Sequence, residues 1–119
     1  MKAGIDPDIL RRVVGNDPEF LREVLEDFVC HAQSEITAIR AAFVSQDAEQ
    51  MKIPTHRFKG SASLMGARQV VEVCARLEAA AGANDWPMIQ SLMPCLDGLM
   101  QHIKTSTNAL RGLLPDPCT

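Results

Sequence analysis

The sequence predicts an all-α protein: an antiparallel up-and-down four-helix bundle with a short extra N-terminal helix. Three observations predict this class. Apolar residues recur every three or four positions through most of the 119 residues, which is the period of an amphipathic helix. No segment alternates strictly between apolar and polar residues, and the aromatic residues that strands favour make up only 4%. Short breaks between the helical segments favour antiparallel neighbours.

Two start signals open the chain. Asp6 followed by Pro7 is a helix N-cap with Pro at the first helical position, and it predicts a short helix to about Val14. Asp17 followed by Pro18 repeats the signal and predicts a helix of about 27 residues, roughly 40 Å long. The inward face of this long helix is an apolar series: Leu21, Leu25, Phe28, Ala32, Ile36, Ile39 and Phe43.

Three further helices follow, each begun or ended by a recognisable residue. Asp47 is expected to cap the first, which ends at Gly66. The second is expected over about 68–81, and the third runs from position 84 or 85 to Gly112. Inward positions in these two are Val70, Val73, Leu77, Ala81, Ile89, Met93, Leu96, Met100, Ile103 and Leu110. Pro54 and Pro94 lie inside helices and predict kinks.

Composition and charge narrow the class of protein. A chain of 119 residues corresponds to one domain, here 1–119 with a core over about 5–111 and a frayed tail over 112–119. The net charge of -3 argues against nucleic acid as a partner. No apolar run approaches the ~18 residues of a membrane span, and no leader precedes the first helix. We expect a cytoplasmic, monomeric protein that does not bind membranes.

The four cysteines are spaced for neither zinc nor a disulfide framework. Cys30, Cys74, Cys95 and Cys118 include no Cys-x-x-Cys pair and no zinc-like spacing to His. We therefore expect structural thiols that pack as small apolar groups, with Cys118 exposed on the tail. The chain also has no nucleotide-binding Gly-rich loop. It is expected to hold no metal or cofactor and to hydrolyse nothing alone.

One helical segment combines an apolar face with an unusual polar face. Residues three and four apart share a face of a helix, so one side carries Met51, Thr55, Phe58, Ala62 and Met65. The other side carries Lys52, His56, Lys59, Gly60 and Ser63. The first set is what a helix buries. The second leaves an imidazole in water beside two ammonium groups.

This polar face suits a histidine that carries a phosphoryl group. Imidazole is a good nitrogen nucleophile near neutral pH, and an ammonium one turn away offsets the charge of a phosphoryl group. Gly60 inside a helix costs about 1 kcal/mol relative to Ala, which indicates a steric reason for it. Clearance for the phosphoryl group and for a partner is the obvious reason.

These residues resemble the signature of histidine-containing phosphotransfer (HPt) domains. The match is His-x-x-Lys-Gly-Ser at 56–61 and Leu-x-Gly-Ala at 64–67, with further similarity at 73–78 and 17–21. It covers roughly residues 5 to 105 and departs from the family at Phe58, where Leu is more common. The resemblance implies the same bundle fold, phosphorylation of His56, charge stabilisation by Lys59 and clearance at Gly60.

The resemblance also implies what the partner supplies. A receiver domain would bring the phospho-accepting Asp, its Mg²⁺ and most of the catalysis, so the chain would be a phosphoryl carrier rather than an enzyme. It would take the group from one receiver-domain Asp and pass it to another. The receivers would belong to response regulators and hybrid sensor kinases.

Other residues are weaker candidates. Ser63 lies on the same face, where it either donates a hydrogen bond to the phosphoryl group or is simply a small surface residue. Lys52 is a candidate to stabilise the phosphoryl group only because helix geometry puts it one turn before His56. Glu78 would accept from the second imidazole nitrogen or stay solvated. Between 50 and 71 the chain has Lys and Arg but no Asp or Glu, which fits docking onto an acidic surface. Candidate docking residues are Ile9, Val13 and Ile53 at the centre and Arg57 and Arg68 at the rim.

Three alternatives stay open. In the first, the chain is a helical adaptor that binds signalling proteins without carrying phosphate, although the intact motif argues against this. In the second, it is the HPt domain of a larger chemotaxis-type kinase. In the third, it is a metal-binding bundle, which needs Cys and His ligands that converge. His31 and His102 lack the surrounding motif of His56 and are expected to be solvated.

Overall fold

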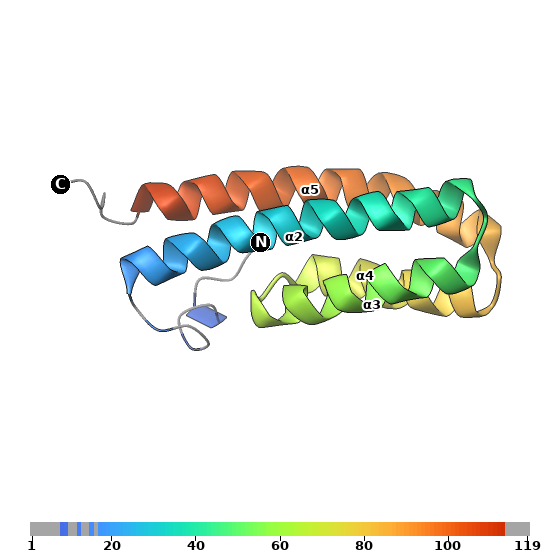
Figure 1. The fold of residues 1–119 in the computed structure, drawn as a ribbon, viewed down its shortest axis with the longest axis horizontal. Coiled ribbons are helices and arrows are strands. Elements are labelled where there is room, and N and C mark those ends of the chain that lie inside the picture. The colour runs from blue at the N-terminus through green and yellow to red at the C-terminus, as the bar shows by residue number, and fades with distance from the viewer. Residues whose placement is uncertain (1–7, 10–11, 13–14, 16, 114–119) are drawn as a thin grey trace.

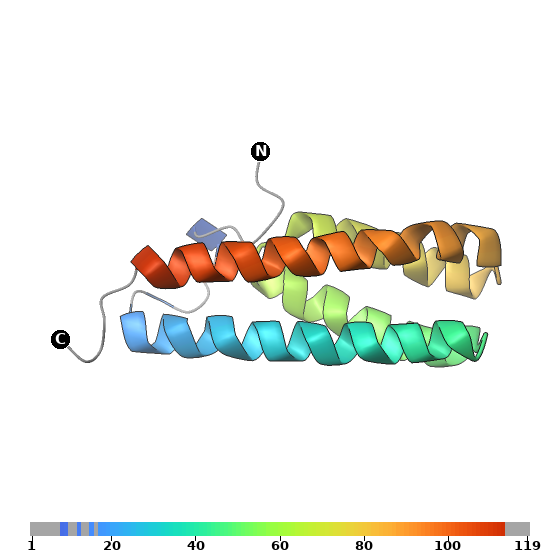
Figure 2. The ribbon, with the colours of Figure 1, turned by 90° about the horizontal axis from the view of Figure 1, so that it is seen from above.

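The computed structural model describes residues 8, 9, 12, 15 and 17–113. Its described part contains four long helices and no strand: α2 (Pro18–Val44), α3 (Ala48–Leu64), α4 (Arg68–Gly82) and α5 (Trp86–Leu113). Consecutive helices run antiparallel, and α5 returns beside α2 to close the bundle (Figures 1 and 2). The predicted all-α four-helix bundle is confirmed. Of the expected helix over 6–14, residues 8, 9 and 12 are helical, and the remainder lies outside the described residues.

Helix α2 forms where the sequence predicts it and has the predicted 27 residues. Asp17 caps it, because its carboxylate accepts from the backbone N–H of Glu19 at 3.0 Å and of Phe20 at 3.5 Å. Six of the seven expected inward residues are buried. The seventh, Phe43, is half-buried and lies against the Trp86 ring, with the centroids 6.3 Å apart.

The three connections between helices share one geometry. Each contains three residues, and the middle one has a positive φ: 53° at Gln46, 70° at Gly66 and 52° at Asn84. The N–H of the next residue reaches back to a carbonyl five positions earlier, as in Asp85 to Ala80 at 2.8 Å. This is the Schellman motif, which satisfies the last carbonyls of a helix.

Aspartates after two of these turns start the next helix. Asp47 accepts from the N–H of Gln50 at 3.1 Å, and Asp85 accepts from that of Met88 at 3.2 Å. Position 85 is therefore the start signal of α5. At its other end α5 continues through Gly112 to Leu113, a small extension beyond the predicted end.

The core confirms most of the predicted inward faces. All five residues on the expected buried face of α3 are 5% exposed or less, including Phe58 at 0%. Val73 and Leu110 are only half-buried and pack against the edge of the core, whereas Cys74 and Leu99, which were not predicted, are buried in it. Neither Pro54 nor Pro94 ends its helix. None of the described helices has the apolar stretch needed to cross a membrane.

Two helices are much longer than the other two, and this difference places α3 and α4. Helices α2 and α5 have 27 and 28 residues, whereas α3 and α4 have 17 and 15. The short pair therefore packs along only part of the long pair, as Figure 1 shows. The polar face of α3 lies in the middle of that helix, flanked by α2 on one side and α4 on the other.

Candidate functional site

His56 lies on the exposed side of α3, with 72% of its side chain accessible. One residue earlier, the buried Thr55 donates from Oγ1 to the Met51 carbonyl at 2.7 Å. Two residues later, Phe58 is fully buried. The helix thus uses one face to anchor itself in the core and presents the imidazole on the opposite face, as its spacing predicts.

Helix α4 brings a carboxylate to this imidazole. Glu78 Oε2 lies 3.3 Å from His56 Nδ1, and Glu78 Oε1 lies 2.6 Å from Lys59 Nζ. Burial raises the pKa of Glu78, but hydrogen bonds from Lys59 and His56 outweigh it, so the pKa is lowered overall. Glu78 is therefore an anion that contacts both functional groups of the motif. The structure brings together His56, Lys59 and Glu78.

The remaining residues of the polar face differ in what they contact. A Cβ built on Gly60 would meet nothing within 4 Å, so the space beside His56 is open to solvent. Ser63 is exposed on the same face. Lys52 does not join the site, because its ammonium pairs with Glu49 at 3.0 Å, back toward the start of α3. The role expected for Lys52 toward a phosphoryl group stays a prediction.

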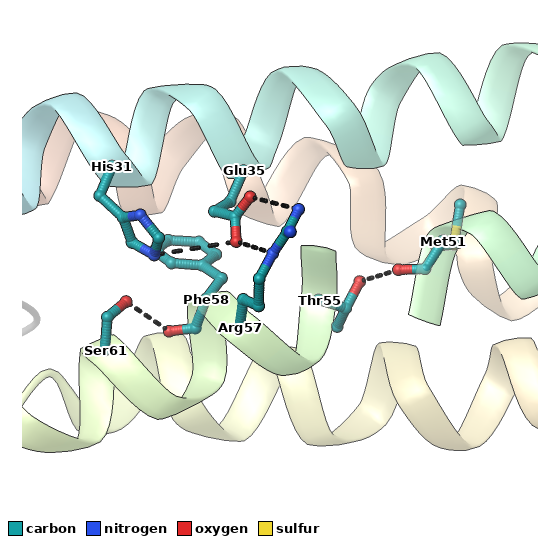
Figure 3. A network of polar contacts seen from close by, with 7 residues as sticks. All are labelled: His31, Glu35, Met51, Thr55, Arg57, Phe58 and Ser61. Carbon is teal, nitrogen blue, oxygen red and sulfur yellow. Dashed lines mark hydrogen bonds and ion pairs between the residues drawn. The ribbon is translucent and has the colours of Figure 1, made fainter. Parts of the chain in front are cut away.

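Arg57 contacts a residue that the sequence analysis did not identify. Its Nε donates to Glu35 Oε2 at 2.8 Å and its Nη2 donates to Glu35 Oε1 at 3.1 Å (Figure 3). Glu35 lies on α2 with 5% of its side chain exposed, and His31 Nε2 approaches the same carboxylate at 3.7 Å. The guanidinium is thus held against α2. His31, expected to be solvated, is half-buried beside the carboxylate.

A signal for Glu35 existed in the sequence. It lies seven residues after Phe28 and three after Ala32, which places it on the inward face of α2. A carboxylate there needs a cation in reach, and a single sequence does not identify which of the later Arg and Lys residues supplies it.

The basic stretch around His56 carries less free charge than its sequence indicates. Lys52, Arg57 and Lys59 each pair with an acidic residue from the start of α3, from α2 or from α4. Arg68 is exposed at the first position of α4. Two of these acids, Glu35 and Glu78, lie on other helices, so the charge balance around His56 depends partly on residues that are distant in sequence.

Apolar side chains flank His56 along the exposed side of α3. Ile53, one turn before His56, is 53% exposed, and Leu64, two turns after it, is 59% exposed. Leu64 was not predicted, although its spacing of eight residues from His56 puts it on the same side. Of the other docking candidates, Ile9 is half-buried and Val13 lies outside the described residues.

The cysteines divide into two kinds. Cys74 is fully buried, and burial together with the nearby Glu78 charge raises its pKa to about 12. Cys30 and Cys95 are exposed, so the expected apolar packing role is wrong for both. Cys118 lies outside the described residues. Among the residues that the structure describes, no group of three or more His, Cys, Asp and Glu converges on one point.

The comparisons with known proteins agree with this geometry. The family model described as Hpt domain matches residues 23–110. The fold is similar to the crystal structure of histidine-containing phosphotransfer protein B (HptB) from Pseudomonas aeruginosa PAO1, with a TM-score of 0.85 and 21% sequence identity. That match covers 93% of this chain and 96% of the HptB chain. None of the curated proteins compared with the sequence matches it. Because the family model spans most of the chain, including the segment around His56, the chain belongs to the Hpt domain family of phosphotransfer proteins.

Proposed function

We propose that the chain is a phosphorelay intermediate that accepts a phosphoryl group on His56 from one receiver-domain Asp and passes it to another. The observation that carries this proposal is the contact between His56 Nδ1 and Glu78 Oε2. A histidine with one nitrogen engaged by a carboxylate keeps its proton on that nitrogen, and the other nitrogen is left as a lone-pair donor. Here the free nitrogen is Nε2.

The transfer step follows from this arrangement. The Nε2 lone pair attacks the phosphorus of an aspartyl phosphate, the N–P bond forms, and the P–O bond to the Asp breaks with its electrons leaving on the carboxylate. The ring keeps the Nδ1 proton and becomes positively charged while it bears the phosphoryl group. Glu78, held anionic by its hydrogen bonds, stabilises that charge. Delivery to a second receiver is the reverse reaction.

Lys59 and Gly60 serve the phosphoryl group itself. Lys59 Nζ lies on Glu78 in the free protein, and rotation about its flexible side chain moves the ammonium to the phosphoryl oxygens one turn away on the same face. Gly60 leaves the space open for these oxygens and for the partner surface. Phosphoryl transfer depends mainly on positioning and charge neutralisation, so these residues complete the carrier's share of the site.

The receiver domain supplies the remaining chemistry. In this proposal it brings the phospho-accepting Asp and a Mg²⁺ ion, whereas this chain holds no cofactor. The exposed Ile53 and Leu64 on either side of His56 form the apolar centre of the docking surface, with Arg68 at its rim. Such a relay contact is small, since quick release requires it. A cytoplasmic location and a monomeric state stay predictions.

The test is phosphoryl uptake from a phosphorylated receiver domain. Wild type should acquire an acid-labile, base-stable label, and His56→Gln should acquire none. His31→Gln and His102→Gln are matched controls that remove the other two histidines and should label normally. A folded wild-type protein that takes no label from several receivers would instead favour the adaptor function. Label that persists in His56→Gln would assign the phosphoryl group to another residue.

A further inference from the structure

The sequence of α3 around His56 has low intrinsic helix stability. Pro54 lacks the N–H that would bond to the Gln50 carbonyl, and Gly60 is the residue that disfavours a helix interior most after Pro. Directly after each of these residues, Thr55 Oγ1 and Ser61 Oγ donate to backbone carbonyls of Met51 and Phe58, contacts that compete with the helix ladder. Contacts with neighbouring helices must therefore fix where this segment lies.

One such contact is an ion pair with α2, in which the carboxylate is buried and the guanidinium is 57% exposed. Glu35, with 5% of its side chain exposed, receives two hydrogen bonds from Arg57 at 2.8 and 3.1 Å. A side-on guanidinium–carboxylate pair fixes both distance and orientation. Arg57 directly follows His56, and the pair lies one turn after Pro54, where the helix's own bonding is interrupted. Figure 3 shows Arg57 reaching up from α3 to Glu35 on α2.

We infer that Glu35 is a positioning residue for phosphoryl transfer: through Arg57 it sets the rotation of α3, and so the direction in which His56 faces the receiver and Glu78. This inference rests on the proposed function. Glu35 is too buried to touch a partner, so any effect on transfer passes through Arg57. His31 contacts the same carboxylate at 3.7 Å but lies on α2 itself, so this contact does not link Glu35 to α3.

The experiment measures transfer from a phosphorylated receiver at increasing receiver concentration in four proteins: wild type, Glu35→Gln, the double variant Glu35→Met with Arg57→Met, and His31→Gln. The double variant replaces the ion pair by apolar side chains of similar length, which keeps the fold because no charge is left buried alone. Circular dichroism and urea unfolding check that each variant is folded.

We expect the transfer rate at saturating receiver to fall in Glu35→Gln and in the double variant, by on the order of tenfold in the latter. The receiver concentration at half-maximal rate should change little, and His31→Gln should behave as wild type. The ¹⁵N shifts of the His56 ring should also change in both Glu35 variants without phosphorylation, because the contact of Nδ1 with Glu78 is altered. A merely structural pair would leave these shifts unchanged.

Three outcomes would overturn the inference. One is a folded double variant that transfers at the wild-type rate. Another is an unchanged rate at saturation with a lower half-maximal concentration, which would mean that a released Arg57 simply docks better. The third is a loss in His31→Gln equal to that in Glu35→Gln. Absence of label in wild type itself would contradict the proposed function instead, so the two failures are distinguishable.

Discussion

Two carboxylates hold α3 from opposite sides, and they differ in burial. Glu78 on α4 contacts His56 and Lys59 with 27% of its side chain exposed, whereas Glu35 on α2 contacts Arg57 with 5% exposed. An ion pair near water is weak and exchanges partners readily. In the Arg57 pair the guanidinium is 57% exposed, so separation would leave only the Glu35 carboxylate without solvent.

This difference matches two separate tasks at the site. In the proposed relay, the contact on the α4 side includes the groups that respond to the phosphoryl group, so the Lys59 ammonium has to leave Glu78. In the same proposal, the contact on the α2 side involves no group that reacts, so it can stay in place while Lys59 changes partner.

The largest expected difference in stability is between two variants, each of which removes the cation of one pair. Arg57→Met leaves Glu35 buried with only His31 nearby, and we expect it to lower the free energy of unfolding by about 2–3 kcal/mol. Lys59→Met should lower it by less than about 1 kcal/mol, because Glu78 keeps His56 and water. Urea unfolding at pH 7 measures both. Equal losses would show that the two carboxylates do not differ as their burial indicates.

A second variant tests the low helix propensity of α3 at Gly60. Gly60→Ala should raise the free energy of unfolding by about 1 kcal/mol, since a Cβ there meets nothing within 4 Å. Uptake of phosphoryl from a small donor should be unchanged, whereas transfer from a receiver should slow. The added methyl group occupies the space that a docked partner needs. Gly98→Ala on α5, which also meets nothing, is the matched control and should gain stability without slowing transfer.

The sequence predicted the Glu78 side of this comparison better than the Glu35 side. The motif around His56 singled out the histidine that contacts Glu78, and helical spacing placed Met51 and Phe58 in the core and His56 in water. Apolar spacing likewise predicted the order of the helices, and their bounds to within a few residues. These features depend on local periodicity, which a single sequence contains in full.

What the sequence did not predict depends on pairs of residues far apart in the chain. Glu35 and Arg57 meet only because α2 and α3 pack antiparallel in one particular register. The Lys52 pair is different, because Glu49 lies three residues away on the same helix and was within reach of local reasoning. Charged side chains are long and flexible, so helix geometry limits their reach without determining their partner.

The pH dependence of stability tests the Glu78 side of the comparison. Because the pKa of Glu78 is lowered on folding, its contribution is present above the unfolded value of about 4.3 and is lost as pH falls through the folded value. The stability difference between wild type and Glu78→Gln should thus be largest near pH 7, at less than about 1 kcal/mol, and should shrink toward pH 3. Urea unfolding across this range measures it. Glu72→Gln removes another α4 carboxylate, which pairs with Arg76 at 3.4 Å, and should not reproduce the full difference. A gap between wild type and Glu78→Gln that widens at low pH would contradict the lowered pKa.

The smallest effect concerns Cys74, which lies one turn before Glu78 and responds to the same charges. Its pKa is raised to about 12 first by burial and then by Glu78, while Lys59 lowers it. In the native protein a thiol reagent at pH 8 should therefore modify the exposed Cys30 and Cys95 and leave Cys74 intact. Peptide mass mapping after brief labelling distinguishes these sites. Glu78→Gln should increase labelling of Cys74 only slightly, because burial is the larger cause, whereas urea should expose it fully. Rapid labelling of Cys74 in the folded variant would mean that the Glu78 contacts, and not the core beneath them, keep α4 closed against α3.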